Sequence, residues 1–210
     1  MIGLINDYKE FKSFIQKLEN KPKLFLHACC APCSSHCLKV LKDYFDITIF
    51  FSNDNIYPFE EYEKRLEEII KFAKAYNNIN VIENGYNHDD FLKSINGKEN
   101  LGERSIRCYE CYKLRMEKTI ILAKELGFDY YTTTLSLSPY KNSNWINEIG
   151  YELENKYGLK YLYSNFKKEE GYRDSIALSE EFGLYRQDYC GCEYSKRERN
   201  EAIDRAKEKN

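Results

Sequence analysis

One stretch decides the fold of this 210-residue chain: Leu24-Phe25-Leu26-His27-Ala28-Cys29-Cys30-Ala31-Pro32-Cys33. Residues 24–26 are apolar, and together with His27 they have the length of a short buried strand. The cysteine-bearing loop follows directly, and a helix is expected from about Ser34, capped by its own hydroxyl or by that of Ser35. A strand that leads through a loop into a helix is the first unit of an α/β sheet.

The same unit recurs along the chain. Further strands are expected at Ile47–Phe51, Asn80–Ile82, Tyr130–Thr134 and Lys160–Tyr163. Helices are expected from Pro58, at His88–Ile95, from Cys108 to Gly127, and at Asn142–Tyr157, Tyr172–Glu181 and Ser195–Lys207. Alternating strands and helices predict an α/β fold: a mostly parallel, Rossmann-like sheet of about five strands flanked by helices.

The length fits a single domain over residues 1–210. We expect its core over about residues 22–165. Residues 166–210 are expected to be a helical C-terminal extension that folds back over the sheet and carries the last cysteine pair.

Composition indicates a globular protein in a reducing compartment. Charged residues make up 31% of the chain and aromatic residues 15%, and the net charge is -2. The first 23 residues carry charges throughout, and no stretch approaches the roughly 20 apolar residues of a membrane span. We therefore expect a cytoplasmic protein without a membrane partner, in which clustered cysteines are metal ligands or redox catalysts.

Seven of the eight cysteines fall into three tight groups. They are Cys29, Cys30 and Cys33; Cys108 and Cys111; and Cys190 and Cys192. The first group follows the first strand, and polar residues follow the second and fourth strands, at 52–55 and 134–141. Ligands bind beyond the carboxyl ends of parallel strands, so the fold is expected to assemble one site from these remote segments.

The middle pair has the spacing of metal ligands. Cys108 and Cys111 lie at a predicted helix start, where the helix dipole, Arg107 and Arg115 are expected to lower the pKa of both thiols. Thiolates bind zinc or iron-sulfur clusters, and softness alone does not separate the two. The adjacent pair Cys29-Cys30 is easier to accommodate on an iron-sulfur cube than in a zinc knuckle.

The last pair differs in kind. Because glycine separates Cys190 from Cys192, a small strained disulfide can close, and strained disulfides are redox-active. We interpret the pair as a dithiol/disulfide couple. Cys37 is expected to be a core cysteine, and His27 either orients the cysteine loop or is a satisfied core histidine.

With these motifs in place, the chain resembles the cobalamin-independent epoxyqueuosine reductases, the QueH family. The matching segments are Leu26–Cys33, Phe50–Pro58, Glu61-Tyr62 with Arg65, Arg107–Cys111 with Arg115, and Tyr185–Cys192. They keep the family's order over roughly residues 24 to 195. Asp54 and Tyr57 depart from the family's usual proline and histidine and leave the cysteine framework intact.

The resemblance implies an enzyme that reduces epoxyqueuosine to queuosine at the wobble position of tRNA, with an external electron donor. It implies a [4Fe-4S] cluster held by Cys29, Cys30, Cys108 and Cys111, and redox catalysis by Cys190 and Cys192. A further mononuclear iron, with Cys33 as a ligand, is a less direct implication. For tRNA and substrate contacts the candidates are Asn53, Asn55, Arg107, Tyr140 and Lys141.

Two other functions are compatible with the cysteines. Cys30-Ala31-Pro32-Cys33 between a strand and a helix resembles a thioredoxin-type thiol-disulfide oxidoreductase. Cysteine ligands could equally build a zinc-stabilised RNA-binding module without enzymatic activity. A thiol-disulfide oxidoreductase would not need the other two cysteine groups. Metal analysis distinguishes the zinc-stabilised module from the reductase.

Overall fold

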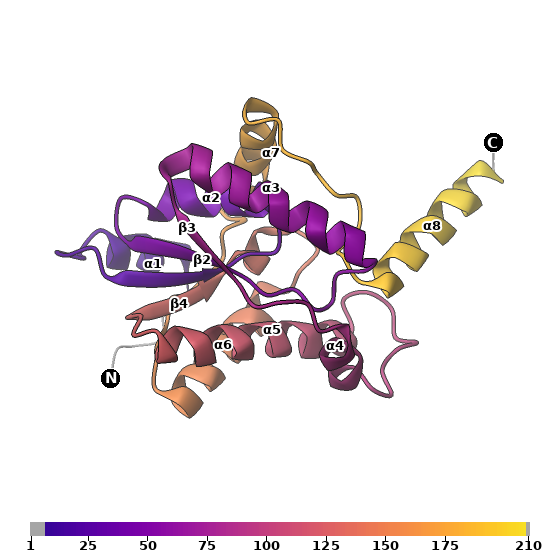
Figure 1. Ribbon diagram of the computed structural model, residues 1–210, viewed down its shortest axis with the longest axis horizontal. Helices are drawn as coiled ribbons and strands as arrows, with labels where there is room; N and C mark the ends of the chain where they lie inside the picture. Colours follow the sequence, from indigo (N-terminus) through magenta and orange to yellow (C-terminus); the bar gives the residue numbers. More distant parts are fainter. Residues whose placement is uncertain (1–6, 209–210) are drawn as a thin grey trace.

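A single parallel sheet forms the centre of the molecule, with the strand order β3-β2-β1-β4-β5 (Figure 1). The computed structural model describes residues 7–208, so the predicted domain over residues 1–210 extends at both ends beyond the described part. The strands are β1 (Lys23–His27), β2 (Asp46–Phe51), β3 (Asn80–Glu83), β4 (Tyr130–Thr133) and β5 (Lys160–Tyr161). All neighbouring strands run parallel, which confirms the predicted Rossmann-like α/β fold.

Helices make the crossovers that parallel strands require. They are α1 (Tyr8–Ile15), α2 (Ala31–Leu41), α3 (Phe59–Asn77), α4 (His88–Ser94), α5 (Ile106–Glu125), the 3-10 helix η1 (Thr134–Leu137), α6 (Ser143–Tyr157), α7 (Gly171–Glu181) and α8 (Glu193–Lys207). Helix α1 was not predicted from the sequence. Asp7 caps this helix through the backbone N–H groups of Lys9 and Glu10, and its apolar side chains are buried.

Successive side chains of the central strands point to opposite faces of the sheet, so the core has two parts, one on each face. Leu24 and Leu26 of β1 pack on one face with α1, α2 and α3, whereas Phe25 packs on the other with α5 and α6. Figure 1 shows the two helical layers on opposite sides of the sheet. Since both faces are covered, the strands must be apolar at nearly every position, as the sequence of β1 is.

The predicted start of α2 is wrong by three residues. The helix begins at Ala31, with Pro32 in its first turn, so Cys33 lies on the helix and not in a loop. The hydroxyls of Ser34 and Ser35 do not cap it: they donate back to the carbonyls of Cys30 and Pro32. Proline is favoured at this position because its fixed φ suits a helix start and its missing N–H is not needed there.

The C-terminal extension folds back only in part. Helix α7 packs against α2, as expected, but α8 projects away from the body (Figure 1). The reason is composition: α8 carries charged residues on every side, and residues 200–208 are all exposed. In the part of the chain that the structure describes, no helix is both long and apolar enough to cross a membrane.

Gly171 allows α7 to dock against the rest of the extension. A Cβ at this position would lie 1.9 Å from the Phe166 carbonyl oxygen and 2.7 Å from Nε2 of His36. We expect Gly171→Ala to lower the free energy of unfolding by about 1–3 kcal/mol, as overpacking of a filled core does. Thermal unfolding measures this. The control Gly102→Ala, where nothing lies within 4 Å of the new Cβ, is expected to unfold like the parent chain.

Candidate functional site

The first cysteine group lies at the point where the strand order reverses. Strand β1 pairs with β2 on one side and with β4 on the other, and ligands bind at such a crevice. Cys29 follows β1, and its Sγ lies 3.8 Å from Oγ1 of Thr134, which follows β4. The predicted convergence of the loops after the first and fourth strands is therefore confirmed.

Three thiols meet in this crevice. The sulfur atoms of Cys29, Cys30 and Cys33 all lie within 4.8 Å of one another. The pKa of Cys29 falls well below its ordinary value because Cys30 and Cys33 donate hydrogen bonds to its sulfur, and because Lys141 and Arg115 face it. The hydrogen bond to Cys29 and burial raise the pKa of Cys30 to about 12, although Cys33 and Arg65 act in the opposite direction. The crevice thus stabilises anionic sulfur.

Buried guanidinium groups surround the thiols. Arg65, Arg107 and Arg115 are each at most 2% exposed. Burial alone would lower the pKa of the Arg65 guanidinium, but Cys30 and Glu61 raise it overall. Burial likewise opposes the charge of Arg115, and Cys111 and Cys29 raise the pKa of its guanidinium. These side chains therefore stay charged and offset negative charge on sulfur.

The middle pair corrects one expectation. Cys108 and Cys111 lie in the first turns of α5, yet the pKa of Cys108 is raised to about 11 and that of Cys111 to about 12. Burial is the main cause and outweighs Arg107 and Arg115, while Cys190 raises both values further. The prediction that both pKa values are lowered is wrong. Burial removes the hydration that stabilises a thiolate, and this effect is larger than the stabilisation by the helix N-terminus and the arginines.

The last pair is held over the site by backbone contacts. The backbone N–H of Tyr57 donates to the Gly191 carbonyl at 2.8 Å, and Nη1 of Arg65 donates to the Cys190 carbonyl at 3.3 Å. Gly191 has φ 135°, which a residue with a side chain rarely adopts. Glycine between the two cysteines is thus required by the backbone itself. The thiols of Cys190 and Cys192 are both free in this structure.

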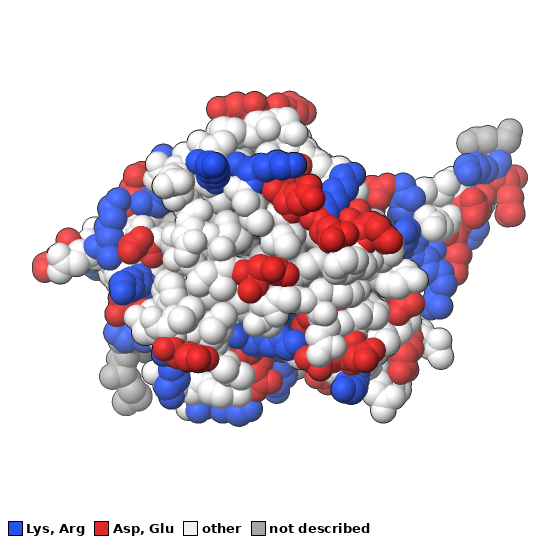
Figure 2. Space-filling model, viewed as in Figure 1, with Lys and Arg blue, Asp and Glu red and all other residues white. Residues whose placement is uncertain are grey.

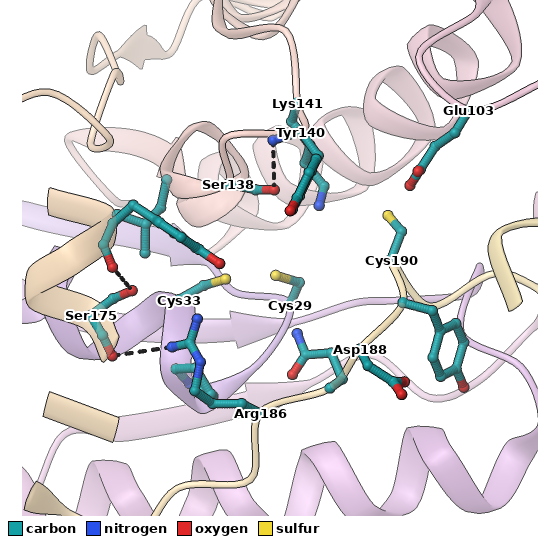
Figure 3. Close-up of a pocket in the computed structure, with 15 residues that line it drawn as sticks. Cys29, Cys33, Glu103, Ser138, Tyr140, Lys141, Ser175, Arg186, Asp188 and Cys190 are labelled. Atoms are coloured by element: carbon teal, nitrogen blue, oxygen red, sulfur yellow. Dashed lines mark hydrogen bonds between the residues drawn. The ribbon is translucent and has the colours of Figure 1, made fainter. Parts of the chain in front are cut away.

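A cavity of about 330 Å³ opens beside these groups. Its walls come from the first cysteine loop, the segment after β4, helix α7 and the segment before α8 (Figure 3). Cys29 and Cys33 reach it from one wall and Cys190 from the C-terminal segment, while Tyr140 and Lys141 lie on another side (Figure 3). Two of the three cysteine groups therefore share one cavity.

The predicted substrate contacts divide into two groups. Tyr140 and Lys141 line the cavity, and Tyr140 is 58% exposed. Asn53, Asn55 and Arg107 do not line it and are at most 2% exposed. Asn53 supports the cysteine loop from behind: its Nδ2 donates to the Ala28 carbonyl and its Oδ1 accepts from Nη2 of Arg115. Arg107 donates to Glu198 of α8.

The ammonium of Lys141 faces the thiols. Burial alone would lower its pKa, but Cys190, Cys29, Tyr112 and Cys33 raise it overall. The side chain therefore remains a cation at the cavity wall.

Two residues of this site, Gln187 and Arg65, were not predicted to be functional from the sequence. Nε2 of Gln187 donates to Sγ of Cys30 at 3.0 Å, which places the C-terminal segment directly on the first cysteine group. Arg65 connects the same segment to α3. Both residues stand in the motifs that carry the family resemblance, and their position there was the only signal that could have indicated them.

Two other predictions concern residues near the loop. His27 is a satisfied core histidine: it is fully buried, and its ring contacts Oγ1 of Thr133 at 2.8 Å and the Ser52 carbonyl at 3.2 Å. Burial and Arg115 lower its pKa to about 3, so it stays neutral. Cys37 is fully buried in the core, as expected.

The donor set fits an anionic iron-sulfur group. The thiols are soft ligands, and buried cations compensate the charge that such a group brings. Nη2 of Arg65 and Nε of Arg115 are buried without a hydrogen-bond partner, which leaves donors for sulfur acceptors. The residues present therefore accommodate this kind of cofactor.

Comparison with solved structures supports the fold. The chain is similar to the U34-tRNA thiolase NcsA from Methanococcus maripaludis, a structure solved with its [4Fe-4S] cluster, with a TM-score of 0.53 and 16% sequence identity. The match covers 89% of this chain and 67% of that one. At this identity the likeness concerns the arrangement of the sheet and helices alone.

Comparison of sequences identifies the family. The family model described as epoxyqueuosine reductase QueH matches residues 24–198. The QueH protein of Streptococcus pyogenes is 40% identical over 86% of this chain and 72% of its own length. That of Thermotoga maritima is 39% identical over 85% of this chain and 92% of its own length. The match includes all three cysteine groups, and the chain belongs to the QueH family of epoxyqueuosine reductases.

Proposed function

We propose that this chain reduces the epoxide of epoxyqueuosine, at the wobble position of tRNA, to the cyclopentene of queuosine. The observation that carries the proposal is the cavity lined by Cys29, Cys33, Cys190 and Lys141, in a chain of the QueH family. It brings thiols and a cation to one space large enough for a small polar group. In the reaction both C–O bonds of the epoxide break, a C=C bond forms and the oxygen leaves as water.

The reaction consumes two electrons and two protons, which is what a dithiol releases when it closes to a disulfide. We assign this role to Cys190 and Cys192, because Cys190 lines the cavity and its partner lies one residue behind it. An external electron donor must then return the dithiol to its reduced state. Lys141 places a positive charge at the wall of the cavity, where it would stabilise negative charge developing on the epoxide oxygen.

Cys29, Cys30, Cys108 and Cys111 are the proposed ligands of a [4Fe-4S] cluster, which supplies single electrons when bound. Arg65 and Arg115 would offset its charge. An additional mononuclear iron would have Cys33 as its ligand, because this thiol lies beside the first two and also faces the cavity. Cluster chemistry of this kind fits a cytoplasmic location, where thiols stay reduced.

The target nucleoside must leave its stack to enter the cavity. Tyr140 is the side chain best placed to receive it: its ring is exposed at the rim, and the Arg104 guanidinium lies 5.4 Å from the ring centroid. Stacking on aromatic side chains is the usual means by which proteins hold an unpaired RNA base. The predicted base-binding role of Tyr140 is thus retained in the proposal.

Two measurements on anaerobically prepared protein test the function. Iron and sulfide analysis with absorbance near 400 nm checks the cofactor, and mass spectrometry of tRNA nucleosides after incubation checks the product. We expect conversion of epoxyqueuosine to queuosine. Bound zinc without iron, together with tRNA binding and an unchanged nucleoside, would overturn the proposal. More iron than one cube holds would support the additional iron site.

Gln187 is expected to adjust the reduction potential of the cluster through its hydrogen bond to Cys30. An N–H···S bond stabilises the more negative, reduced state more strongly. Gln187→Leu removes this bond, and we expect a potential more negative by up to about 59 mV, a tenfold change in a one-electron equilibrium. Potentiometric titration monitored by electron paramagnetic resonance measures it.

Ser175→Ala is the matched control, because Ser175 also lines the cavity but its hydroxyl donates to the Tyr172 carbonyl. It is expected to leave the potential unchanged. Equal potentials in the Gln187→Leu variant and the parent chain would show that this side chain has no influence on the cluster.

A further inference from the structure

Helix α8 is anchored at one end only. Glu198 accepts hydrogen bonds from Nη2 of Arg107 at 3.0 Å and from the Glu103 backbone N–H at 3.1 Å. Tyr194 is buried against Phe91. Every such contact lies in the first two turns of the helix, and residues 200–208 are all exposed. The second half of α8 is thus exposed to solvent along its length.

The charges of α8 are separated around the helix. At 100° per residue, Lys196, Arg199, Asn200, Ile203 and Lys207 lie on one face. Asp204 borders this face, and its Oδ1 lies 3.6 Å from Nζ of Lys207. The acidic residues Glu193, Glu201 and Asp204 lie on another side, together with Arg197. The projecting helix carries both basic and acidic side chains (Figure 2). We call the first set the basic stripe.

The basic stripe begins at the rim of the cavity. Arg199 forms an ion pair with Asp188, and Nζ of Lys196 lies 5.8 Å from the ring centroid of Tyr189. Both Asp188 and Tyr189 line the cavity. Arg199 also neutralises the acidic side chain at this rim, which lowers the barrier to an approaching polyanion.

We propose that the basic stripe of α8 is a docking surface for the RNA backbone next to the target nucleoside. This inference rests on the proposed function, because it takes tRNA as the substrate. A nucleotide that enters the cavity leaves its flanking phosphates at the rim, where Lys196 and Arg199 stand. Fifteen residues of helix extend about 22 Å, so the stripe is long enough to contact several phosphates along one strand.

The projecting half of the helix also lies beyond the segment that the family model matches, which ends at residue 198. Apart from Lys196, the residues of the stripe therefore lie outside the matched segment. Lysine and arginine bind phosphates without reading sequence, so the stripe positions the tRNA and does not select it.

A charge-matched pair of variants tests the docking surface. The full-length protein with Lys196→Gln and Lys207→Gln loses two charges from the stripe; the control with Arg197→Gln and Arg205→Gln loses two charges from other sides of the same helix. Binding of an unmodified full-length tRNA transcript is measured by fluorescence anisotropy at several salt concentrations. For the stripe variant we expect about tenfold weaker binding at low salt and a salt slope reduced by about 2.

The control is expected to bind within about twofold of the parent chain. Equal losses in both variants would mean that net charge alone matters, and no loss in either would mean that RNA docks elsewhere; each result overturns the proposal. Because transcript binding requires no cofactor and no turnover, failure of the reductase chemistry leaves this outcome unaffected. If the reductase is active, the stripe variant is expected to show a raised KM and an unchanged kcat.

Discussion

Replacing Cys190 by serine is expected to lower turnover about 10³-fold or more, as loss of a residue that acts as part of a catalytic unit does. Serine preserves the shape of the side chain but cannot close a disulfide with Cys192. The backbone contacts that hold this segment, from Tyr57 to Gly191 and from Arg65 to Cys190, do not involve the sulfur atom. Iron content and tRNA affinity are therefore expected to stay at the level of the parent chain.

The measurement is single-turnover conversion of epoxyqueuosine, followed by nucleoside mass spectrometry. Cys192→Ser is expected to give the same loss, because either thiol alone cannot form the pair. Cys37→Ala serves as the control, since Cys37 is buried in the core away from the cavity. Retained turnover in Cys190→Ser would remove the dithiol from the reaction, and loss of iron would make Cys190 a ligand instead.

Cys111→Ala is expected to abolish cofactor binding, with iron near background and turnover reduced about 10³-fold or more. Burial raises the pKa of Cys108 to about 11 and of Cys111 to about 12, so both are neutral thiols until a metal displaces their protons. Their buried, cation-flanked position is therefore best explained by ligand roles.

Cys33 provides the decisive comparison, because it lies within 4.8 Å of Cys29 and Cys30. If the cluster uses the second cysteine pair, Cys33→Ala keeps the cube, and only iron beyond the cube is lost. Iron and sulfide analysis of the two variants, with the absorbance near 400 nm, distinguishes these cases. Retention of the cube in Cys111→Ala and its loss in Cys33→Ala would reverse the assignment.

Sequence patterns predicted the elements well where burial alone determines them. The central residues of strand β1 are apolar because both faces of the sheet are covered. This pattern does not depend on which elements pack against each face. Helix α1 was missed although the sequence carries its signal: Asp7, a good N-cap, precedes Tyr8, Phe11 and Ile15 at helical spacing. The start of α2 was misplaced because the serine hydroxyls can bond either to a helix start or back to the preceding turn.

Predictions within the site failed where two opposing effects compete. The sequence places arginines and a helix start beside Cys108 and Cys111, but it carries no measure of burial, and burial decides the pKa of both thiols. The sequence likewise shows only the polar character of Asn53, Asn55 and Arg107, whereas the structure places all three in the interior, where they do not line the cavity. Their contact with the substrate stays a prediction.

The family and the kind of chemistry could be predicted from the sequence alone. The evidence was the order of the three cysteine groups and the glycine between Cys190 and Cys192, because the spacing of thiols can be read directly from the residues. Only the tertiary structure decided how the groups meet. It placed Cys33 beside Cys29 and Cys30, connected Gln187 to Cys30, and brought Cys190 to the cavity with Lys141. The contact of Gln187 with Cys30 and the shared cavity of Cys190 and Lys141 join segments far apart in the chain, and they exist only once the parallel sheet has aligned the ends of its strands.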